Sequence, residues 1–228
     1  MPALRPFPTS WTRAVCVLPH PDDMEYGPAA AAALWVQQGK QLSYVLITSG
    51  EAGIDGTAPE TAGALREAEE VAAARQVGVE DLEFLRFPDS AIEDTAELRT
   101  AIANAVRPRE PELIVLLNHH DRWAYGGANT SDHMRAGQAV LGCVAEYSFP
   151  RLRWIGIADS PRIDHAVDVT DTMDRGLAAL REHRAYLAAL GGEQWSVDHV
   201  LGNARQAGRM FGTRYAAAFE LREHRAGQ

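Results

Sequence analysis

The feature that most constrains the fold is a regular alternation of short apolar runs with longer stretches of helical spacing. The apolar runs lie at 13–18, 41–48, 82–87 and 112–118. Each is followed by a stretch in which alanine, valine or leucine recurs at helical intervals. Continuous apolar strands are typical of a sheet covered on both faces, and strand–helix alternation is typical of parallel pairing. The sequence therefore predicts an α/β fold with a mostly parallel central sheet.

The expected helices follow these strands in order, at 25–39, 61–78, 95–111 and 131–147. The last third of the chain is less regular. Its pattern indicates short strands at 153–158 and 165–170, one long helix at 172–190, and a final strand or helix at 213–221. No repeat or linker interrupts the pattern. We therefore expect a Rossmann-like three-layer sandwich that forms one domain over residues 1–228.

Charge and apolar content narrow the class of partners. The net charge is −9, from 22 basic and 31 acidic side chains, which argues against nucleic acid and against a cationic membrane-surface protein. The first residues lack the apolar core of a signal peptide, and the longest apolar stretch, 27–36, is too short to span a bilayer. Cys16 and Cys143 each lie in an apolar run, as small buried hydrophobes do. We expect a cytoplasmic protein with neither a nucleic-acid nor a membrane partner.

The first predicted strand ends in an unusual polar turn. His20, Asp22 and Asp23 follow it directly, and the two adjacent carboxylates repel each other unless a metal, a helix N-terminus or solvent compensates. In a turn, His20 and Asp23 can face the same side while Asp22 points elsewhere. This arrangement suits two metal ligands and a separate carboxylate. A surface turn with a capping aspartate is the alternative, but capping explains neither the histidine nor the second aspartate.

A catalytic zinc site typically has three protein ligands and one open position. His133, near the start of the expected helix at 131–147, is a candidate for the third ligand. The loops after the first and fourth strands can be neighbours where the strand order of an open sheet reverses. The sequence therefore predicts a metal site at the carboxyl edge of the sheet.

These motifs resemble the LmbE-like, or PIG-L, family of zinc-dependent N-acetylglucosaminyl deacetylases. The family's His-Pro-Asp-Asp-x-Glu-x-Gly motif is matched by His20, Pro21, Asp22, Asp23, Glu25 and Gly27. Weaker matches follow in the family's order, at Arg66, Glu69, Gly78, Val79, Asp89, His133 and His183. The resemblance extends over nearly the whole chain.

The resemblance implies a metal-dependent hydrolase that removes an N-acetyl or other N-acyl group from a small amino sugar or its conjugate. It implies one Zn²⁺ per chain, with ferrous iron as an alternative, held by His20, Asp23 and His133. Asp22 would be the general base for a zinc-bound water.

The resemblance also implies that Arg66 and Asp89 bind the sugar. From the residues alone, two alternatives stay open. Arg66 could pair with Glu69 or Glu70 on a helix face, and Asp89 could be an ordinary turn residue.

One departure from the family lies just before His133. Many members carry a histidine at the position of Thr130, where it helps to polarise the amide. We expect His119 or His120, from the same loop, to point an imidazole into the pocket instead. We assign catalysis to His120, oriented by Asp132, with His119 binding substrate.

Asn129 is a further predicted substrate contact, and a weaker hydrogen bond from Thr130 or Asn129 is the alternative to a substitute histidine. Trp123 and Tyr125 either form a wall or lid for the sugar or anchor the loop. We expect structural roles for His165, His199 and His224.

Two rival functions are an amidase for a larger acyl conjugate and a binding protein without catalysis, although the presence of Asp22 argues against the second. The exact acceptor and homo-oligomerisation stay open.

Overall fold

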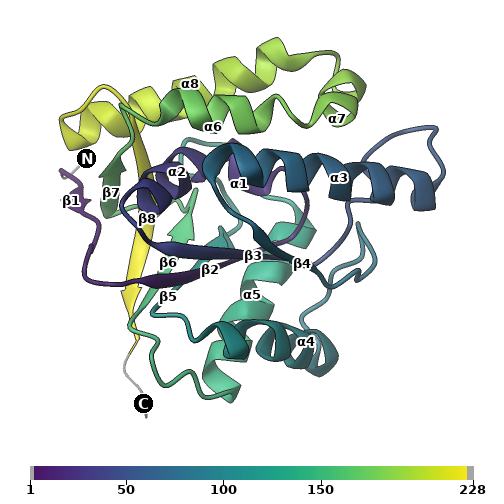
Figure 1. Ribbon diagram of the computed structural model, residues 1–228, viewed down its shortest axis with the longest axis horizontal. Helices are drawn as coiled ribbons and strands as arrows, with labels where there is room; N and C mark the ends of the chain where they lie inside the picture. Colours follow the sequence, from purple (N-terminus) through teal and green to yellow (C-terminus); the bar gives the residue numbers. More distant parts are fainter. Residues whose placement is uncertain (1–2, 225–228) are drawn as a thin grey trace.

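The computed structural model describes residues 3–224 and contains an eight-stranded sheet with helices on both faces (Figure 1). The strands are β1 (Arg5–Pro6), β2 (Arg13–Leu18), β3 (Gln41–Leu46), β4 (Asp81–Phe84), β5 (Leu113–Leu117), β6 (Trp154–Ala158), β7 (His165–Asp168) and β8 (Ala216–Glu223). Their spatial order is β1-β7-β8-β6-β5-β2-β3-β4. Within the described chain only β8 is reversed, since it pairs antiparallel with both β6 and β7. The predicted α/β sandwich with a mostly parallel sheet is confirmed.

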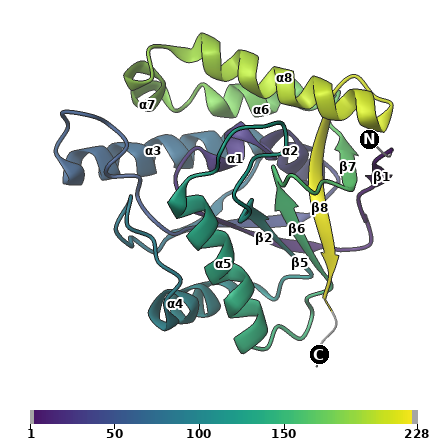
Figure 2. The ribbon, with the colours of Figure 1, turned by 180° about the vertical axis from the view of Figure 1, so that it is seen from behind.

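The helices form layers above and below the sheet (Figures 1 and 2). One face is covered by α1 (Asp23–Tyr26), α2 (Ala29–Gln37) and α3 (Pro59–Val77), and α8 (Glu193–Phe211) packs against β7 and β8 on the same face. Over α2 and α3 lie α6 (Met173–Leu180) and α7 (Arg184–Ala189). The other face is covered by α4 (Ala96–Val106), the 3-10 turn η1 (Arg107–Arg109) and α5 (Ser131–Glu146). No helix within residues 3–224 has both the length and the apolarity needed to cross a membrane.

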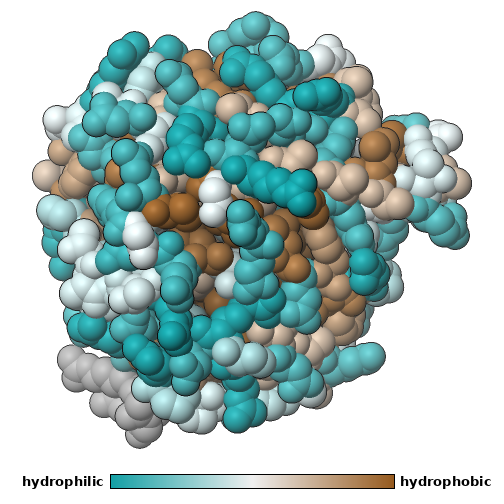
Figure 3. Space-filling view, viewed as in Figure 1, coloured by the Kyte–Doolittle hydropathy of each residue, from teal (hydrophilic) through white to brown (hydrophobic). Residues whose placement is uncertain are grey.

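Two hydrophobic cores explain why the strands read as continuous apolar runs. Cys16 and Leu18 of β2 pack into the core beneath α2 and α3. Val15 and Val17, on the opposite face of the same strand, pack into the core beneath α4 and α5. Alternate side chains of one strand thus enter different cores. The face in Figure 3 is mostly hydrophilic, and its hydrophobic residues gather near the middle, where Figure 1 places β3 and β4.

Two expected helices are each divided in the structure. The segment 25–39 breaks at Gly27, where a Cβ would lie only 2.6 Å from Asp159 Oδ2, and Pro28 lacks the N–H that a continuous helix needs. The segment 172–190 breaks between Leu180 and Arg184. This break lets the fully buried His183 side chain reach Glu25.

Two elements near the end of the chain could not be assigned from the sequence and were identified only in the structure. Residues 213–221 were left open between strand and helix, and most of them belong to strand β8. The helix α8 was not predicted at all. The domain expected over residues 1–228 includes positions 1, 2 and 225–228, which lie outside the described residues.

The reversal of strand order determines where a site can form. Strands β3 and β4 lie on one side of β2, whereas β5 and β6 lie on the other. The loops that leave β2 and β5 therefore diverge at the carboxyl edge of the sheet and leave a crevice between them. This crevice brings the turn at 19–22 next to the loop at 118–130, as the sequence predicted.

Candidate active site

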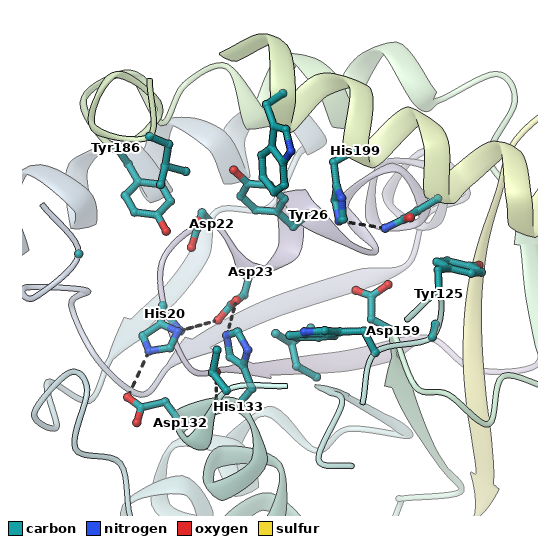
Figure 4. Close-up of a pocket in the computed structure, with 18 of the residues that line it drawn as sticks. His20, Asp22, Asp23, Tyr26, Tyr125, Asp132, His133, Asp159, Tyr186 and His199 are labelled. Carbon is teal, nitrogen blue, oxygen red and sulfur yellow. Dashed lines mark hydrogen bonds and ion pairs between the residues drawn. The ribbon is translucent and has the colours of Figure 1, made fainter. Parts of the chain in front are cut away.

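A cavity of about 1020 Å³ opens at the carboxyl edge of β2 and β5. The turn after β2, the loop after β5 and the first turn of α5 line one side. Helices α7 and α8 contribute the facing wall (Figure 4). Trp123 and Tyr125 are part of the lining, and their contact with a sugar stays a prediction.

His20, Asp23 and His133 come together at the bottom of this cavity. Asp23 Oδ2 lies 3.4 Å from His20 Nδ1, and Asp23 Oδ1 lies 3.1 Å from His133 Nε2 (Figure 4). One ligand atom from each residue falls within 4.8 Å of the others. Burial alone would raise the pKa of Asp23, but His133 and His20 outweigh it and hold that pKa below its usual range. The group therefore combines an ionised carboxylate with two imidazoles.

The outer partners of the two histidines fit a metal site. His20 Nε2 lies 3.1 Å from Asp89 Oδ1 and 3.4 Å from Asp132 Oδ2. His133 Nδ1 lies 3.3 Å from Asn129 Oδ1. In proteins a metal-binding histidine usually donates its other ring N–H to a carboxylate or an oxygen acceptor. Each imidazole thus has one nitrogen held from outside and the other turned toward Asp23, so these residues fit a divalent ion such as Zn²⁺.

Asp22 is a buried carboxylate in a strained backbone conformation. Its φ is 94°, a region that residues other than glycine rarely adopt. Its N–H donates to Glu70 Oε2 at 3.0 Å, and its Oδ1 accepts from Arg66 at 3.0 Å. Burial, opposed by Arg66 and assisted by Asp23, raises the pKa of Asp22 to about 6. The side chain nevertheless lines the cavity, which suits a proton acceptor.

Arg66 is buried and does not lie on a solvated helix face. Its guanidinium donates to the carbonyl oxygens of Pro21 and Gly50 as well as to Asp22. It also lies over the ring of Tyr186, 4.1 Å from the ring centroid. The pairing with Glu69 or Glu70 that the sequence left open is therefore not what the structure shows. Arg66 holds the turn and Asp22, and its guanidinium forms part of the cavity wall.

Asp89 and Asp132 both lie in the cavity lining and both contact His20. Asp89 also accepts a hydrogen bond from the Ala52 N–H at 2.9 Å. Asp89 thus joins two loops at the site and is more than a local turn residue. Asp132 was predicted to orient His120, but the histidine that it contacts in the structure is His20.

His119 and His120 follow β5, but they turn away from the cavity. His120 Nε2 lies 2.8 Å from Glu220 Oε2 on β8, and His119 Nε2 lies 3.2 Å from Arg222 Nη2. Neither imidazole belongs to the cavity lining. The prediction that one of them points into the pocket is wrong, because polar side chains of β8 hold both.

Two neighbouring residues also differ from their expected contacts. Asn129 donates to the carbonyl oxygens of Asn118 and His120, and its Oδ1 faces His133. It supports a candidate ligand from behind instead of facing substrate. The Thr130 hydroxyl caps α5 by accepting from the His133 N–H.

Sequence reasoning missed the wall formed by the late helices. Tyr186 of α7 and Trp195 and His199 of α8 line the cavity together with Tyr26 of α1, and His199 had been given a structural role. The apolar spacing of Val197, Val200, Leu201, Ala204 and Ala207 is the signal that could have revealed α8. His165 and His224 stay outside the cavity lining.

A second cluster of titratable groups lies behind Asp22. His183 Nε2 is 3.3 Å from Glu25 Oε2 and 3.7 Å from Glu70 Oε2, and all three side chains are fully buried. Burial is the main cause that raises the pKa of Glu25 and of Glu70 to about 8. The Asp22 N–H also donates to Glu70, so this cluster fixes the turn that carries Asp22.

Comparison with known proteins relates the chain to a sugar deacetylase family. The sequence pattern of PIG-L, described as GlcNAc-PI de-N-acetylase, matches residues 15–144. The diacetylchitobiose deacetylase of Thermococcus kodakarensis is 27% identical over 221 residues, which cover 90% of this chain and 80% of that protein. A probable N-acetyl-alpha-D-glucosaminyl L-malate deacetylase 2 of Bacillus anthracis is 29% identical over 189 residues, with 75% and 80% covered.

Solved structures show the same architecture. The N,N'-diacetylchitobiose deacetylase from Pyrococcus horikoshii, complexed with its inhibitor MPG, superposes with a TM-score of 0.84. The superposition covers 93% of this chain and 84% of that chain at 23% sequence identity. At this identity the likeness shows a shared fold.

Proposed function

Because the chain belongs to the PIG-L family, we propose that it is a metal-dependent deacetylase that removes the N-acetyl group from an N-acetylglucosamine unit. The observation that carries this proposal is the cavity in which His20, Asp23 and His133 gather beside the buried Asp22. The names of the relatives support an N-acetylated amino sugar as the substrate. One Zn²⁺ per chain is the proposed cofactor, with ferrous iron as the alternative.

We infer that His20, Asp23 and His133 hold the metal. A bound divalent ion would lower the pKa of a water and polarise the acetamide carbonyl. Asp89 and Asp132 support His20 from the far side of its ring, and Asn129 supports His133. These outer contacts fix the directions of the two imidazoles.

Asp22 is proposed as the general base. It takes a proton from the water that attacks the carbonyl carbon, and its pKa of about 6 suits this task near neutral pH. Arg66 occupies Oδ1, so we assign the proton to Oδ2. The C–N bond then breaks, and the products are acetate and a free amino sugar.

The departing amine also needs a proton. His119 and His120 are held by Arg222 and Glu220, which leaves protonated Asp22 as the donor that we propose. Tyr186 is a proposed hydrogen-bond donor to the substrate, because burial raises the pKa of its hydroxyl above the usual value and keeps it protonated. The site takes residues from the β2 turn through α8, and we therefore propose that the chain works as a single domain.

The deciding experiment combines metal analysis with an acetate-release assay. Purified protein is assayed as isolated, after chelation, and after reloading with Zn²⁺ or Fe²⁺, with N-acetylglucosamine and N,N'-diacetylchitobiose as substrates. We expect about one metal ion per chain, loss of acetate release on chelation, and recovery on reloading. Folded protein that takes up no metal, or loaded protein that releases no acetate, would overturn the proposal.

A further inference from the structure

One face of α8 forms a wall of the cavity opposite the candidate metal ligands. Its lining residues are Trp195, Asp198, His199, Gly202, Asn203 and Gln206. Positions three and four apart share one side of a helix, so these residues form a continuous strip. Figure 4 shows Tyr26 and His199 on one side of the cavity, with His20 and His133 on the other. The strip is therefore placed to contact a part of the substrate away from the reacting amide.

The strip begins with an exposed aromatic platform. Trp195 is 65% exposed, the largest exposure among the large hydrophobic residues described. Its ring stacks on His199 with centroids 5.1 Å apart and an interplanar angle of 20°, and Tyr26 meets His199 edge-on at 6.3 Å. Tyr26 is itself held by a hydrogen bond of 2.6 Å between its hydroxyl and Ser196 Oγ. An indole supported from behind but open to the cavity suits stacking against a flat apolar surface.

The polar groups of the strip are uncharged or acidic. Gln206 offers an amide, and Asn203 offers its amide oxygen, while its Nδ2 lies 3.1 Å from His199 Nε2. Asp198 offers a carboxylate, of which Oδ2 accepts from Gln194. Burial lowers the pKa of His199, so its imidazole stays neutral. Among the described residues of the lining, Arg66 is the only lysine or arginine. Its guanidinium already donates hydrogen bonds to Asp22 and to the carbonyl oxygens of Pro21 and Gly50.

This charge pattern distinguishes between classes of substrate. A carboxylate or phosphate is bound most strongly by a cation or by several free N–H donors. The wall offers no free cation, and Asp198 would repel an anion. A pyranose ring, in contrast, has an apolar C–H face and a rim of hydroxyl groups. The C–H face can stack on Trp195, and the hydroxyl groups can form hydrogen bonds with amides and a carboxylate.

We propose, on the basis of the function proposed above, that the α8 strip is a subsite for a second, uncharged sugar ring linked to the N-acetylglucosamine unit. Trp195 stacks on the face of this ring, and Asp198, Asn203 and Gln206 accept or donate hydrogen bonds to its hydroxyls. The volume of about 1020 Å³ lies at the upper end of the range for drug-sized ligands, and it accommodates more than one ring. Substrates with an acidic group in place of the second ring are disfavoured.

Binding measurements on the full chain test this subsite without turnover. Chelator-treated protein is titrated with N-acetylglucosamine, with N,N'-diacetylchitobiose and with N-acetylglucosaminyl malate. We expect the neutral disaccharide to bind up to about 10-fold more tightly than the monosaccharide, the upper end of what one aromatic contact contributes. Trp195→Ala should remove this difference and leave the affinity for the monosaccharide unchanged, whereas Trp195→Phe should retain most of it. The acidic conjugate should bind no more tightly than the monosaccharide.

The control and the kinetic experiment separate the possible failures. Leu65→Ala changes an exposed apolar residue of α3 outside the cavity lining, and it should behave as wild type. Equal affinities of wild type and Trp195→Ala for the disaccharide, or preferred binding of the acidic conjugate, would overturn the subsite. A changed solution mass of Trp195→Ala with unchanged sugar binding would assign the indole to a contact between copies and would also overturn it. Trp195-dependent binding without acetate release from metal-loaded protein would instead uphold the subsite as a sugar-binding site and overturn the deacetylation.

Discussion

Adjacent residues in the turn after β2 have opposite tendencies to hold a proton. Asp23 faces His20 and His133, which outweigh its burial and lower its pKa. Asp22 is buried against Arg66, and its burial raises its pKa to about 6. Two carboxylates with separated pKa values can take different roles in one reaction. The sequence motif identifies the pair, but the assignment of roles depends on which of them the histidines contact.

The role of Asp22 gives a first prediction. Asp22→Asn should keep its metal, because the ligands stay in place, and should lose about 10²–10⁴-fold in kcat, the usual size of a general-base effect. Metal content and acetate release from the same preparation check both parts. Asp174→Asn, an exposed position on α6, is the matched control. Near-normal turnover of Asp22→Asn would exclude Asp22 as the base.

The contact between Asn129 and His133 gives a second prediction. Asn129→Ala removes the oxygen that faces His133 Nδ1, and it should weaken metal binding about 10–100-fold. Titration against a competing chelator measures the change. Asn104→Ala, exposed on α4, should bind metal as wild type does. If Asn129→Ala binds metal equally tightly, Asn129 does not orient the ligand.

The local sequence was enough to predict which residues lie near the site. It was not enough to predict the directions of their side chains. His20, Asp23 and His133 meet because their loops leave neighbouring strands at the point where the strand order reverses. His119 and His120 share the second loop, yet their directions are determined by Glu220 and Arg222, about a hundred residues further along the chain. Spacing within the loop carries no information on such distant partners.

Helix α5 carries a candidate ligand in its first turn, so the start of the helix matters for the site. Its N-cap is Thr130, whose hydroxyl accepts from the His133 N–H. Threonine at this position is thus a structural cap. Capping oxygens satisfy N–H groups that have no partner within the helix.

A third prediction compares two threonine caps. Thr130→Ala and Thr95→Ala, the cap of α4, should each lower the free energy of unfolding by about 0.5–2 kcal/mol. Only Thr130→Ala should also weaken metal binding, because of these two helices only α5 carries a proposed ligand, His133, next to its cap. Denaturant unfolding and metal titration of both variants decide the matter. Equal metal affinity in both would show that the cap does not position His133.

Elements with strong apolar patterns were predictable, and elements with small or polar faces were not. The strands β2, β3 and β5 are buried on both faces and were located correctly. The inner face of α8 instead uses Ser196, Val197, Val200 and Ala204, which give only a weak periodic signal after two glycines. Its cavity side carries mostly polar residues, Asp198, His199, Asn203 and Gln206. The helix that was missed is thus the one that contributes most of a wall.

At the scale of the whole molecule, the buried cluster of Glu25, Glu70 and His183 joins α1, α3 and the break between α6 and α7. Each residue comes from a different part of the chain. Their contacts tie the turn that carries Asp22 to the helices that carry the cavity wall. Stability and site geometry are therefore coupled through one group of side chains.

The cluster gives a fourth prediction, on the pH dependence of stability. The pKa of Glu70 is about 8 in the folded protein against 4.5 for the unperturbed group. Between these values the folded state binds a proton that the unfolded state has lost, so stability falls as pH rises through this window. Glu70→Gln removes the contribution of Glu70 and leaves that of Glu25, whose pKa is also raised to about 8. The variant should therefore lose less stability than wild type between pH ~5 and ~8.5, by up to roughly a few kcal/mol.

Urea unfolding at both pH values measures this difference. Glu97→Gln, exposed on α4, should follow wild type at each pH. A parallel decline of Glu70→Gln and wild type would show that Glu70 is ionised in the folded protein throughout this range.

The reversed strand β8 has a consequence for how the chain is made. It lies between β6 and β7, although it is synthesised after both, so the ribosome must release Ala216–Glu223 before the sheet can close. Until then β6 exposes an unpaired edge, and such edges recruit other chains. The nascent protein is thus at its most aggregation-prone just before synthesis of this strand. Premature termination there would yield a fragment that has nearly every predicted site residue but an incomplete sheet. We expect chaperones to bind such a fragment.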